Sequence, residues 1–224
     1  IASQAFRGEN YIQSVFVPST VERIEARAFE NAWNIDSITF GAVSQLTEIG
    51  RSAFWNANQI EQLTLPEGLT TIRSSAFAYM NRLRVLEIPS TVDTVEYGIV
   101  RGSNAPSVAV IIPNSAQVSS WNTEWNRDNA QVYFGNELTI TEDSTFRYYI
   151  VDGQAKIMGY IVEPTEVTNL QIPSHVTHNG TSYTVSAIGA GAFHQVDQIR
   201  SVVIPKTIEV IEARAFENAW RVEE

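Results

Sequence analysis

The sequence predicts a β-rich α/β solenoid: a right-handed superhelix of repeats of about 23 residues, with parallel strands on one face. Two observations predict it. First, Ala-Phe pairs recur at spacings of 23 to 25 residues within each part of the chain, at 5–6, 28–29, 53–54, 76–77, 192–193 and 215–216. Second, each repeat holds an apolar segment that usually ends at proline, at 12–17, 35–40, 60–65, 83–88, 108–112, 167–172 and 199–204. One repeat has too little apolar surface to form a core alone, so the repeats must stack.

Each repeat is expected to contain one strand and one short turn. In the fourth strand, Leu86 and Ile88 alternate with Val85 and Glu87, so the two pairs point to opposite faces. The Ala-Phe segments are too short for independent helices. We therefore expect one helical or 3-10 turn at each pair, with the phenylalanine buried between layers.

The period is irregular at three places. Tyr-Gly-Ile at 97–99 replaces an Ala-Phe pair, which predicts a looser turn, and a two-residue insertion within 41–46 should bulge on a loop and leave the stack intact. Residues 114–135 break the period and carry Trp121 and Trp125, whose spacing of four fits one face of a helix. We interpret this segment as a cap over the open end of the core. The alternative is that the two tryptophans stack on a sugar.

A second block is predicted after this closing segment. The Asp-Gly pair at 152–153 lies between two apolar runs, which is typical of a β-hairpin, and the Asn-Gly pair at 179–180 indicates another turn. The expected domains are residues 1–135, a repeat block with a tryptophan-containing closing segment, and residues 136–224, a second repeat block opened by a hairpin.

The chain carries the signature of a known repeat family. Ile204-Pro205 is followed by an I-x-x-I-x-x-x-A-F pattern over 208–216, and another strand ends at Ile172-Pro173. This pattern resembles the BspA-like leucine-rich repeats of bacterial and protist surface proteins, over nearly the whole chain. The resemblance implies a leucine-rich repeat fold, a secreted or cell-surface location and an adhesion role, with a host or extracellular-matrix protein as the partner.

A longer period lies over the short one. The decapeptide IEARAFENAW occurs at 24–33 and again at 211–220, 187 residues apart. We therefore expect this chain to be a piece of a longer protein that repeats a unit of that length. Its two ends should be complementary, so an isolated fragment is expected either to self-associate end to end or to have frayed terminal repeats.

Composition excludes several classes of partner. The formal net charge of −10 argues against binding to nucleic acid or to an anionic membrane. The longest apolar runs are about five residues, as at 108–112, so no segment is expected to insert into a membrane. The absence of cysteine excludes disulfides, thiolate metal sites and a cysteine nucleophile.

No residue pattern predicts catalysis, a cofactor or a metal. His175 and His178 could share a metal, but a third ligand is missing nearby, so surface histidines are the simpler interpretation. The carboxylate pairs Glu22–Glu25 and Glu209–Glu212 could serve acid–base chemistry. Because they recur at one phase of the repeat, we interpret them as structural.

The strand face opposite the core is the predicted partner-binding surface. Two outward positions per strand should form two ladders across the stack. The predicted binding residues are Ser14, Phe16, Ser37, Thr39, Gln62, Thr64, Val85, Glu87, Ala109, Ile111, Asn169, Gln171, Ser201 and Val203. The alternative is that these residues are β-formers that only fill a sheet.

The sequence thus favours a non-catalytic surface repeat region that binds a protein. Two alternatives stay open. One is a structural stalk or spacer within a larger tandem-repeat protein. The other is a carbohydrate-binding module that uses exposed tryptophans, with Trp33, Trp55, Trp121, Trp125 and Trp220 as the candidates.

Overall fold

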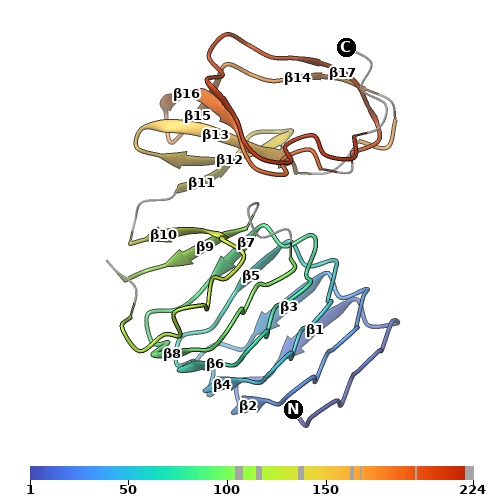
Figure 1. Ribbon diagram of the computed structural model, residues 1–224, viewed down its shortest axis with the longest axis vertical. Helices are drawn as coiled ribbons and strands as arrows, with labels where there is room; N and C mark the ends of the chain where they lie inside the picture. The colour runs from blue at the N-terminus through green and yellow to red at the C-terminus, as the bar shows by residue number, and fades with distance from the viewer. Residues whose placement is uncertain are drawn as a thin grey trace. The chain divides into compact units, whose positions relative to one another are not determined.

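The apolar segments of the repeats form parallel ladders in the computed structural model, which describes residues 1–103, 108–114, 118–135, 139–161, 164–166, 168–194 and 196–219 (Figure 1). The chain divides into two units, Ile1–Gly135 and Asn136–Glu224. In the first unit, β1 (Ser14–Val17) pairs with β3 (Ser37–Phe40). A four-stranded parallel sheet follows, with β5 (Gln62–Thr64), β7 (Val85–Glu87), β9 (Ala109–Ile112) and β10 (Gln131–Phe134). The predicted parallel-strand solenoid with a repeat of about 23 residues is confirmed.

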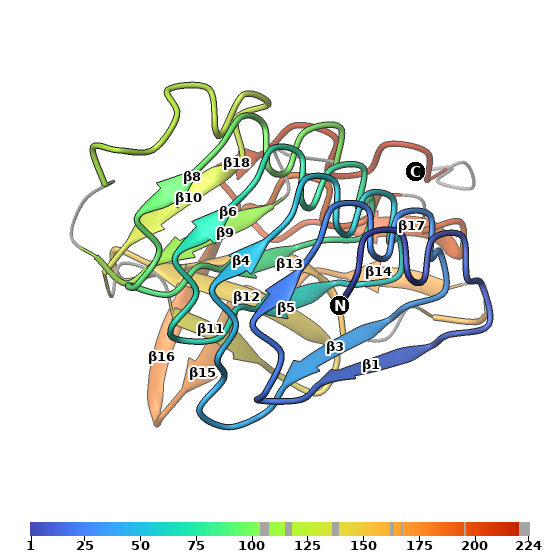
Figure 2. The same ribbon diagram turned by 90° about the horizontal axis from the view of Figure 1, so that it is seen from below.

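A second parallel sheet, which was not predicted, runs along the first unit (Figure 2). Its strands are only two residues long: β2 (Arg23–Ile24), β4 (Glu48–Ile49), β6 (Thr71–Ile72) and β8 (Thr94–Val95). The second residue of each strand is apolar and buried, whereas the first is polar and reaches the surface. This alternation places one side chain per repeat in the core from each of these strands.

The Ala-Phe segments form turns instead of helices, which corrects the predicted helical or 3-10 turns and with them the α/β class. No helix occurs among the described residues. In the second repeat, Arg27 and Asn31 have φ angles of 59° and 60°, a region that a right-handed helix excludes. Between them, alternate N–H groups bond within the turn and to the next repeat; Phe29, for example, donates to the carbonyl of Ala53 at 2.8 Å. The hydrogen bonds between repeats therefore use N–H groups that would bond within the segment if it were a helix.

The phenylalanines of these turns stack on one another through the first unit. The ring centroids of Phe6, Phe29, Phe54 and Phe77 follow at 5.1, 5.2 and 5.9 Å, with nearly parallel planes. The last three rings are buried, which confirms the predicted core position, whereas Phe6 on the first turn is 38% exposed. The apolar side chains of both sheets complete the same core.

The insertion at 41–46 bulges as predicted. Val43 has a φ of 55° and points into solvent, while Leu46 has already returned to the core. Strand β4 then pairs in register with β2, so the stack is intact.

The turn at 97–99 is not looser than the others, contrary to the prediction. Gly98 takes the positive-φ position that Arg27 occupies in the second repeat, and Ile99 and Val100 replace the Ala-Phe pair in the core. The carbonyl of Ile99 accepts a hydrogen bond from Phe77 at 2.8 Å, so the contact to the preceding turn is kept.

The closing segment covers the last repeat of the first unit. Trp121 and Trp125 are buried and meet edge to face, with centroids 5.1 Å apart. The carbonyl of Trp125 accepts from Ile99 at 3.1 Å, and β10 pairs with β9. The described residues of this segment form turns and β10 and not the expected helical face, but its side chains support the cap interpretation.

The second unit opens with an antiparallel hairpin. Strands β12 (Phe146–Val151) and β13 (Gln154–Tyr160) are joined by Asp152 and Gly153, with φ angles of 50° and 76°. Two successive positive φ angles define the turn that matches the twist of a two-residue hairpin, so this prediction is confirmed. Strand β11 (Thr139–Glu142) pairs with β12 on the other side.

Repeat strands follow the hairpin. Strand β13 pairs in parallel with β16 (Thr181–Ile188). Strand β16 also pairs with β15 (His175–His178), antiparallel, and with β18 (Val210–Ile211), parallel. Strand β14 (Thr168–Gln171) pairs in parallel with β17 (Ile199–Val203). The unit has its own core around the buried ring of Phe193. No helix of the described chain is long and apolar enough to cross a membrane.

Candidate functional site

The predicted strand face is a pair of ladders on the first unit. The register places Ser14 beside Ser37, and then aligns Gln62, Val85 and Ala109 with Gln131. The second ladder places Phe16 beside Thr39, and then aligns Thr64, Glu87 and Ile111 with Tyr133. Strand β10 therefore extends both ladders by residues that the prediction did not include.

Most of the predicted ladder residues reach the surface. Phe16 is 65% exposed, and Thr39, Gln62 and Thr64 are also exposed. Glu87 is the single carboxylate of this face, and Thr64 Oγ1 donates a hydrogen bond to it at 3.2 Å. The face is therefore polar but nearly uncharged, with one prominent aromatic ring.

Two of the residues predicted to bind a partner are not exposed, which corrects the prediction. Val85 and Ala109 are buried, with exposed fractions of 2% and 1%. Both side chains are small and lie inside the four-stranded sheet, between the longer side chains of Gln62 and Gln131. They cannot contact a partner without rearrangement of their surroundings.

The second unit carries a shorter ladder. Asn169 lies beside Ser201, whose hydroxyl donates to the Asn169 Oδ1 at 2.9 Å, and Gln171 lies beside Val203. Gln171 and Asn169 are exposed, and Val203 is half exposed. The structure thus places these four predicted residues together on the surface of one sheet.

The tryptophans do not form an exposed row. Trp121 and Trp125 are buried and cannot stack on a sugar. Trp33 is 48% exposed, Trp55 is partly exposed, and Trp220 lies outside the described residues. Among the described tryptophans, the carbohydrate-binding alternative therefore rests on Trp33 and Trp55.

The two histidines weighed as a metal pair lie on strand β15. His175 and His178 are three residues apart, so they point to opposite faces of the strand and cannot share a metal ion. His178 Nδ1 instead lies 2.9 Å from Thr141 Oγ1. Within the part of the chain that the structure describes, no group of three histidine or acidic residues could hold a metal.

The repeated carboxylates hold the turns together. Glu25 accepts a hydrogen bond from the backbone of Ser3, and Glu212 accepts one from the backbone of Ala190, both at 2.9 Å. Glu212 also pairs with Lys156. The same phase of the repeat thus performs the same structural task in both units.

A pocket of about 450 Å³ lies along the turns of the first unit, and we call it the turn pocket. Its floor consists of Ser52 and Ser75, the residues that precede the alanine in the third and fourth repeats. Trp55 and Arg101, which follow the phenylalanine position, line one side. The other side consists of Arg51, Ser74 and Tyr97, and the end near the second repeat consists of Arg27 and Glu30.

A small residue lies between Trp55 and Arg101 on one side of the turn pocket. The residue between Trp55 and Arg101 in the column is Ala78, whose small side chain is fully buried, so larger neighbouring side chains cover the space beside it. The Arg101 guanidinium extends over this space and lies 5.2 Å from the Trp55 ring centroid and 5.9 Å from that of Tyr79. The stem of Arg101 passes over Gly98, where an added Cβ would be only 3.2 Å from it. Gly98 therefore has a packing role that the sequence did not reveal.

The turn pocket has an excess of positive charge. It is lined by Arg27, Arg51 and Arg101 and by one carboxylate, Glu30. That carboxylate already pairs with Arg7 outside the pocket, at 2.7 Å. In an acidic chain, three guanidinium groups around one hollow indicate an anion-binding site.

An ion-pair cluster adjoins the pocket through Ser74. Arg73 pairs with Glu48 at 3.1 Å and with Glu96 at 2.7 Å. Hydrogen bonding from Arg73 lowers the pKa of Glu48 and outweighs the opposing effect of burial. Burial alone would raise the pKa of Glu96, but hydrogen bonds from Arg73 and Ser74 lower it overall. These carboxylates are therefore engaged within the fold and do not neutralise the pocket arginines.

The turn pocket was not predicted from the sequence, although Trp55 was one of the tryptophans proposed to contact a sugar. The available signal was the alignment of repeats on the Ala-Phe pair. That alignment places Ser52 and Ser75 in one column and Trp55, Ala78 and Arg101 in another. The alignment did not show that the Arg101 side chain reaches across two layers to Trp55.

A family model of leucine-rich repeats matches most of this chain. A family model described as a BspA type leucine rich repeat region matches residues 1–106 and 156–224, in six copies. No curated protein matches the chain significantly.

Several solved structures are similar to this chain. The pneumococcal vaccine antigen PcpA has 16% sequence identity and a TM-score of 0.45, over 95% of this chain and 50% of that one. A leucine rich cell surface protein from Faecalibacterium prausnitzii has 20% identity and a TM-score of 0.42, over 100% of this chain and 75% of that one. A leucine-rich repeat protein from Bacteroides ovatus has 18% identity and a TM-score of 0.40, over 99% and 68% of the two chains. The chain thus spans half the length of the PcpA structure.

Proposed function

Because the chain belongs to the BspA-type leucine-rich repeat family, we propose that it is a non-catalytic repeat region of a secreted or cell-surface protein that binds another protein through its strand face. The strand face is defined here by Phe16, Thr39, Gln62 and Thr64 on the first unit. The surface location comes from the family resemblance. The partner is a host or extracellular-matrix protein.

The observation that supports protein binding is the exposed ring of Phe16 on an almost uncharged ladder. The ring is 65% exposed although it lies in the middle of a regular strand. Phe16 lies beside Thr39, so polar β-branched surface adjoins it. Aromatic anchors surrounded by polar, uncharged contacts are typical of the centre of a protein interface.

The non-catalytic part of the proposal is supported by the tasks of the acidic residues. Glu25 and Glu212 bond to backbone N–H groups of the neighbouring turn, and Glu48 and Glu96 pair with Arg73. These carboxylates stabilise the stack and are not gathered around a common hollow. An adhesive role requires no such chemistry.

The test is a binding panel of immobilised purified extracellular-matrix proteins with the whole chain in solution. For each protein that binds, the variant Phe16→Ala should weaken affinity by tenfold or more, since truncation of a central aromatic anchor costs about 2 kcal/mol or more. The double variant Thr39→Lys, Thr64→Lys should abolish binding, because two charges would be desolvated at the interface.

The matched control is Thr20→Lys, Ser90→Lys. Both residues are exposed and lie in loops after β1 and β7, so this variant adds the same charge away from the strand face. Equal loss of binding in the two double variants would reject the strand face as the site. Failure of every panel protein to bind would instead favour the stalk or spacer.

A further inference from the structure

We propose that the turn pocket binds an acidic sugar unit, a pyranose ring that carries a carboxylate or sulfate group. The observation that carries the proposal is a hollow of single-ring size that is lined by two arginines, Arg51 and Arg101, with no ion-pair partner within the described residues, beside a partly exposed tryptophan. This site lies on the turns and not on the strand face, so it is independent of the proposed protein binding.

The anionic part of the ligand follows from the state of the arginines. Within the described residues, neither Arg51 nor Arg101 forms an ion pair. The Nε atom of Arg101 is buried and has no hydrogen-bond partner. A buried N–H of a charged group without an acceptor is costly, so the chain itself does not satisfy Arg101. Because Nε has almost no access to solvent, an oxyanion in the pocket would accept from the other nitrogen atoms of the guanidinium.

The chain does not neutralise the pocket from within. The single carboxylate in its lining, Glu30, has an oxygen 2.7 Å from Arg7 and 4.0 Å from Arg27. Arg7 lies outside the lining, so Glu30 is shared between two cations. The unneutralised charge is thus concentrated on Arg51 and Arg101, which lie on opposite sides of the serine floor. An oxyanion between them could accept from two planar guanidinium groups.

The sugar part of the ligand follows from the rest of the lining. Ser52 and Ser75 on the floor carry hydroxyl groups, which can both donate to and accept from the hydroxyls of a sugar. The Ser74 hydroxyl donates to Glu96 at 2.9 Å and can still accept. Trp55 is held by contacts to Tyr79 and Arg101 and remains partly exposed at the pocket. A fixed aromatic ring offers an apolar surface against which the C–H groups of a sugar ring can pack.

The size of the pocket limits the ligand to a small unit. Its volume of about 450 Å³ lies in the lower part of the range for small-molecule sites, which runs from about 300 to 1,000 Å³. One pyranose ring with its charged substituent fits this volume, whereas a folded protein segment does not. An acidic peptide would therefore be a poorer ligand than an acidic sugar.

The test compares ligands that differ only in the charged group. Glucose, glucuronic acid and glucose 6-sulfate are titrated separately into the whole chain at pH 7, and the indole N–H signals of the tryptophans are followed by NMR. Glucuronic acid or the sulfate should shift the Trp55 signal saturably, and glucose should bind at least about tenfold more weakly, because a hydrogen bond to a charged group is worth more than a neutral one. The two acidic arms show which oxyanion the site prefers.

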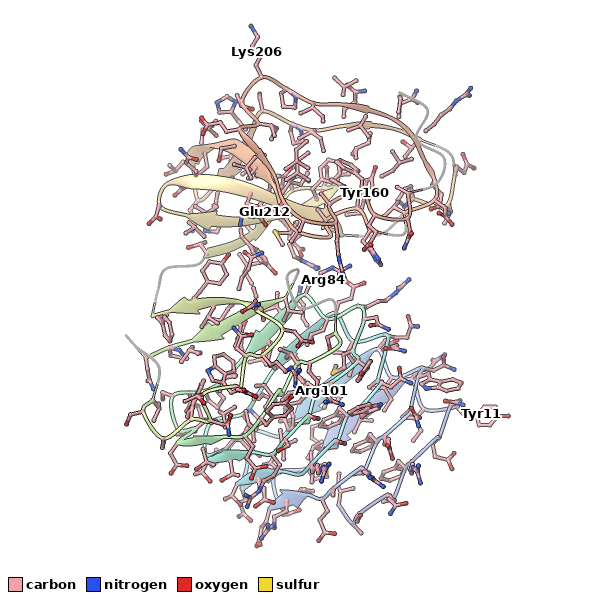
Figure 3. The ribbon with its side chains drawn as sticks, in the orientation of Figure 1. Tyr11, Arg84, Arg101, Tyr160, Lys206 and Glu212 are labelled. Carbon is pink, nitrogen blue, oxygen red and sulfur yellow. The ribbon has the colours of Figure 1, made fainter. Side chains whose placement is uncertain are left out.

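Variants test whether the shift of the Trp55 signal reports binding in the turn pocket. Arg51→Gln, at an exposed side chain that has no ion pair within the described part of the chain, should weaken binding of the acidic sugar by about tenfold and leave the fold unchanged. Lys206→Gln, at an exposed lysine of the second unit that Figure 3 labels, is the matched charge control and should leave binding unaltered. Arg101, labelled in the same view, is tested as Arg101→Lys, which keeps the charge but loses the planar fork and should also weaken binding.

Three outcomes would overturn the proposal. They are equal binding of glucose and the acidic sugars, equal effects of Arg51→Gln and Lys206→Gln, and tighter binding of a short polyglutamate peptide than of glucuronic acid. The strand-face variant Thr39→Lys, Thr64→Lys should retain sugar binding. Failure of the sugar site and failure of the protein site are therefore distinguished in the same preparation.

Discussion

The stacked phenylalanine rings show how much one buried side chain contributes to the layers. Phe77 is fully buried and contacts the ring of Phe54, whereas Phe6 has the same place in the first turn but is 38% exposed. We expect Phe77→Ala to lower the free energy of unfolding by about 3–5 kcal/mol, because the truncation leaves a cavity between layers. Urea unfolding followed by circular dichroism measures this loss.

Phe6→Ala is the matched control for this prediction. It removes the same ring where only one neighbouring ring, that of Phe29, stacks on it and where the side chain is 38% exposed, so its effect should be clearly smaller than that of Phe77→Ala. Similar losses in the two variants, or a loss under about 1 kcal/mol for Phe77→Ala, would contradict the layer position of the Ala-Phe pair.

Arg73 links three consecutive repeats through Glu48 and Glu96. The pKa values of both carboxyls are lowered in the folded state. Their stabilising contribution is therefore fully present above the ordinary carboxyl pKa, about 4.3, and is lost as pH falls through the lower folded-state values. Arg73→Gln should reduce stability at pH 7 and flatten the acid-induced loss of stability below pH about 4.5.

Thermal unfolding at pH 7, 5, 4 and 3 measures this pH dependence. Arg51→Gln is the control. This variant removes the same charge from the neighbouring repeat, but Arg51 has no ion pair within the described residues. If Arg73→Gln and the parent chain lost stability in parallel between pH 5 and 3, the ion-pair cluster would not be the source of the acid sensitivity.

At the scale of the element, the Ala-Phe turns of the first unit each contain two residues with positive φ. Asn31 is one of them, at 60°, and its Oδ1 accepts from Asn56. Glycine adopts this conformation freely, whereas alanine pays roughly 1–2 kcal/mol for it. Asn31→Gly should therefore be more stable than Asn31→Ala by about 1 kcal/mol, and both variants lose the same side-chain hydrogen bond.

This comparison distinguishes the turn from a helix. In a helix interior the order is reversed, with alanine favoured over glycine by about 1 kcal/mol. Urea midpoints of the two variants decide the order. A more stable alanine variant would contradict this turn and support the helical turn that the sequence predicted.

At the scale of the whole molecule, each unit has its own apolar core. The core of the first unit ends at Trp121 and Trp125, which cover its last repeat. We therefore propose that residues 1–135 form an independent domain and expect a fragment of that length to fold alone. Dispersed amide NMR signals and a cooperative thermal transition would be the expected result. A fragment that is unfolded, or folds only when residues 136–224 are added, would contradict it.

The first turn predicts association between copies of this polypeptide. In the stack, Phe6 donates to the carbonyl of Ala28 and Gly8 donates to that of Glu30. Within the described residues, the carbonyls of Ser3, Ala5 and Arg7 accept no backbone hydrogen bond. With Phe6 partly exposed beside them, this end is a site for edge pairing. Light scattering of the 224-residue chain should show a mass that rises with concentration, and a strict monomer up to millimolar concentration would contradict it.

The strand positions could be predicted from sequence because alternation and period are local properties. Pairs such as Leu86 and Ile88 repeat at two-residue spacing, and proline ends most of the segments because it lacks an N–H for the ladder. The hairpin at Asp152 and Gly153 was equally local, since only a few dipeptides accept two positive φ angles.

Only the tertiary structure decided how the turns are built and where the hollow lies. The N–H of Phe29 bonds to the next repeat, so the helix that local propensity favours loses its internal partners. Val85 and Ala109 follow the exposed alternation but are buried, because burial depends on neighbours in other strands. The turn pocket depends on Arg101 reaching across Ala78 to Trp55, a contact between residues 46 positions apart. The sequence by itself determined the layer, its period and its apolar face; the distances between layers, which set hydrogen bonding and access to solvent, were determined only when the layers stacked.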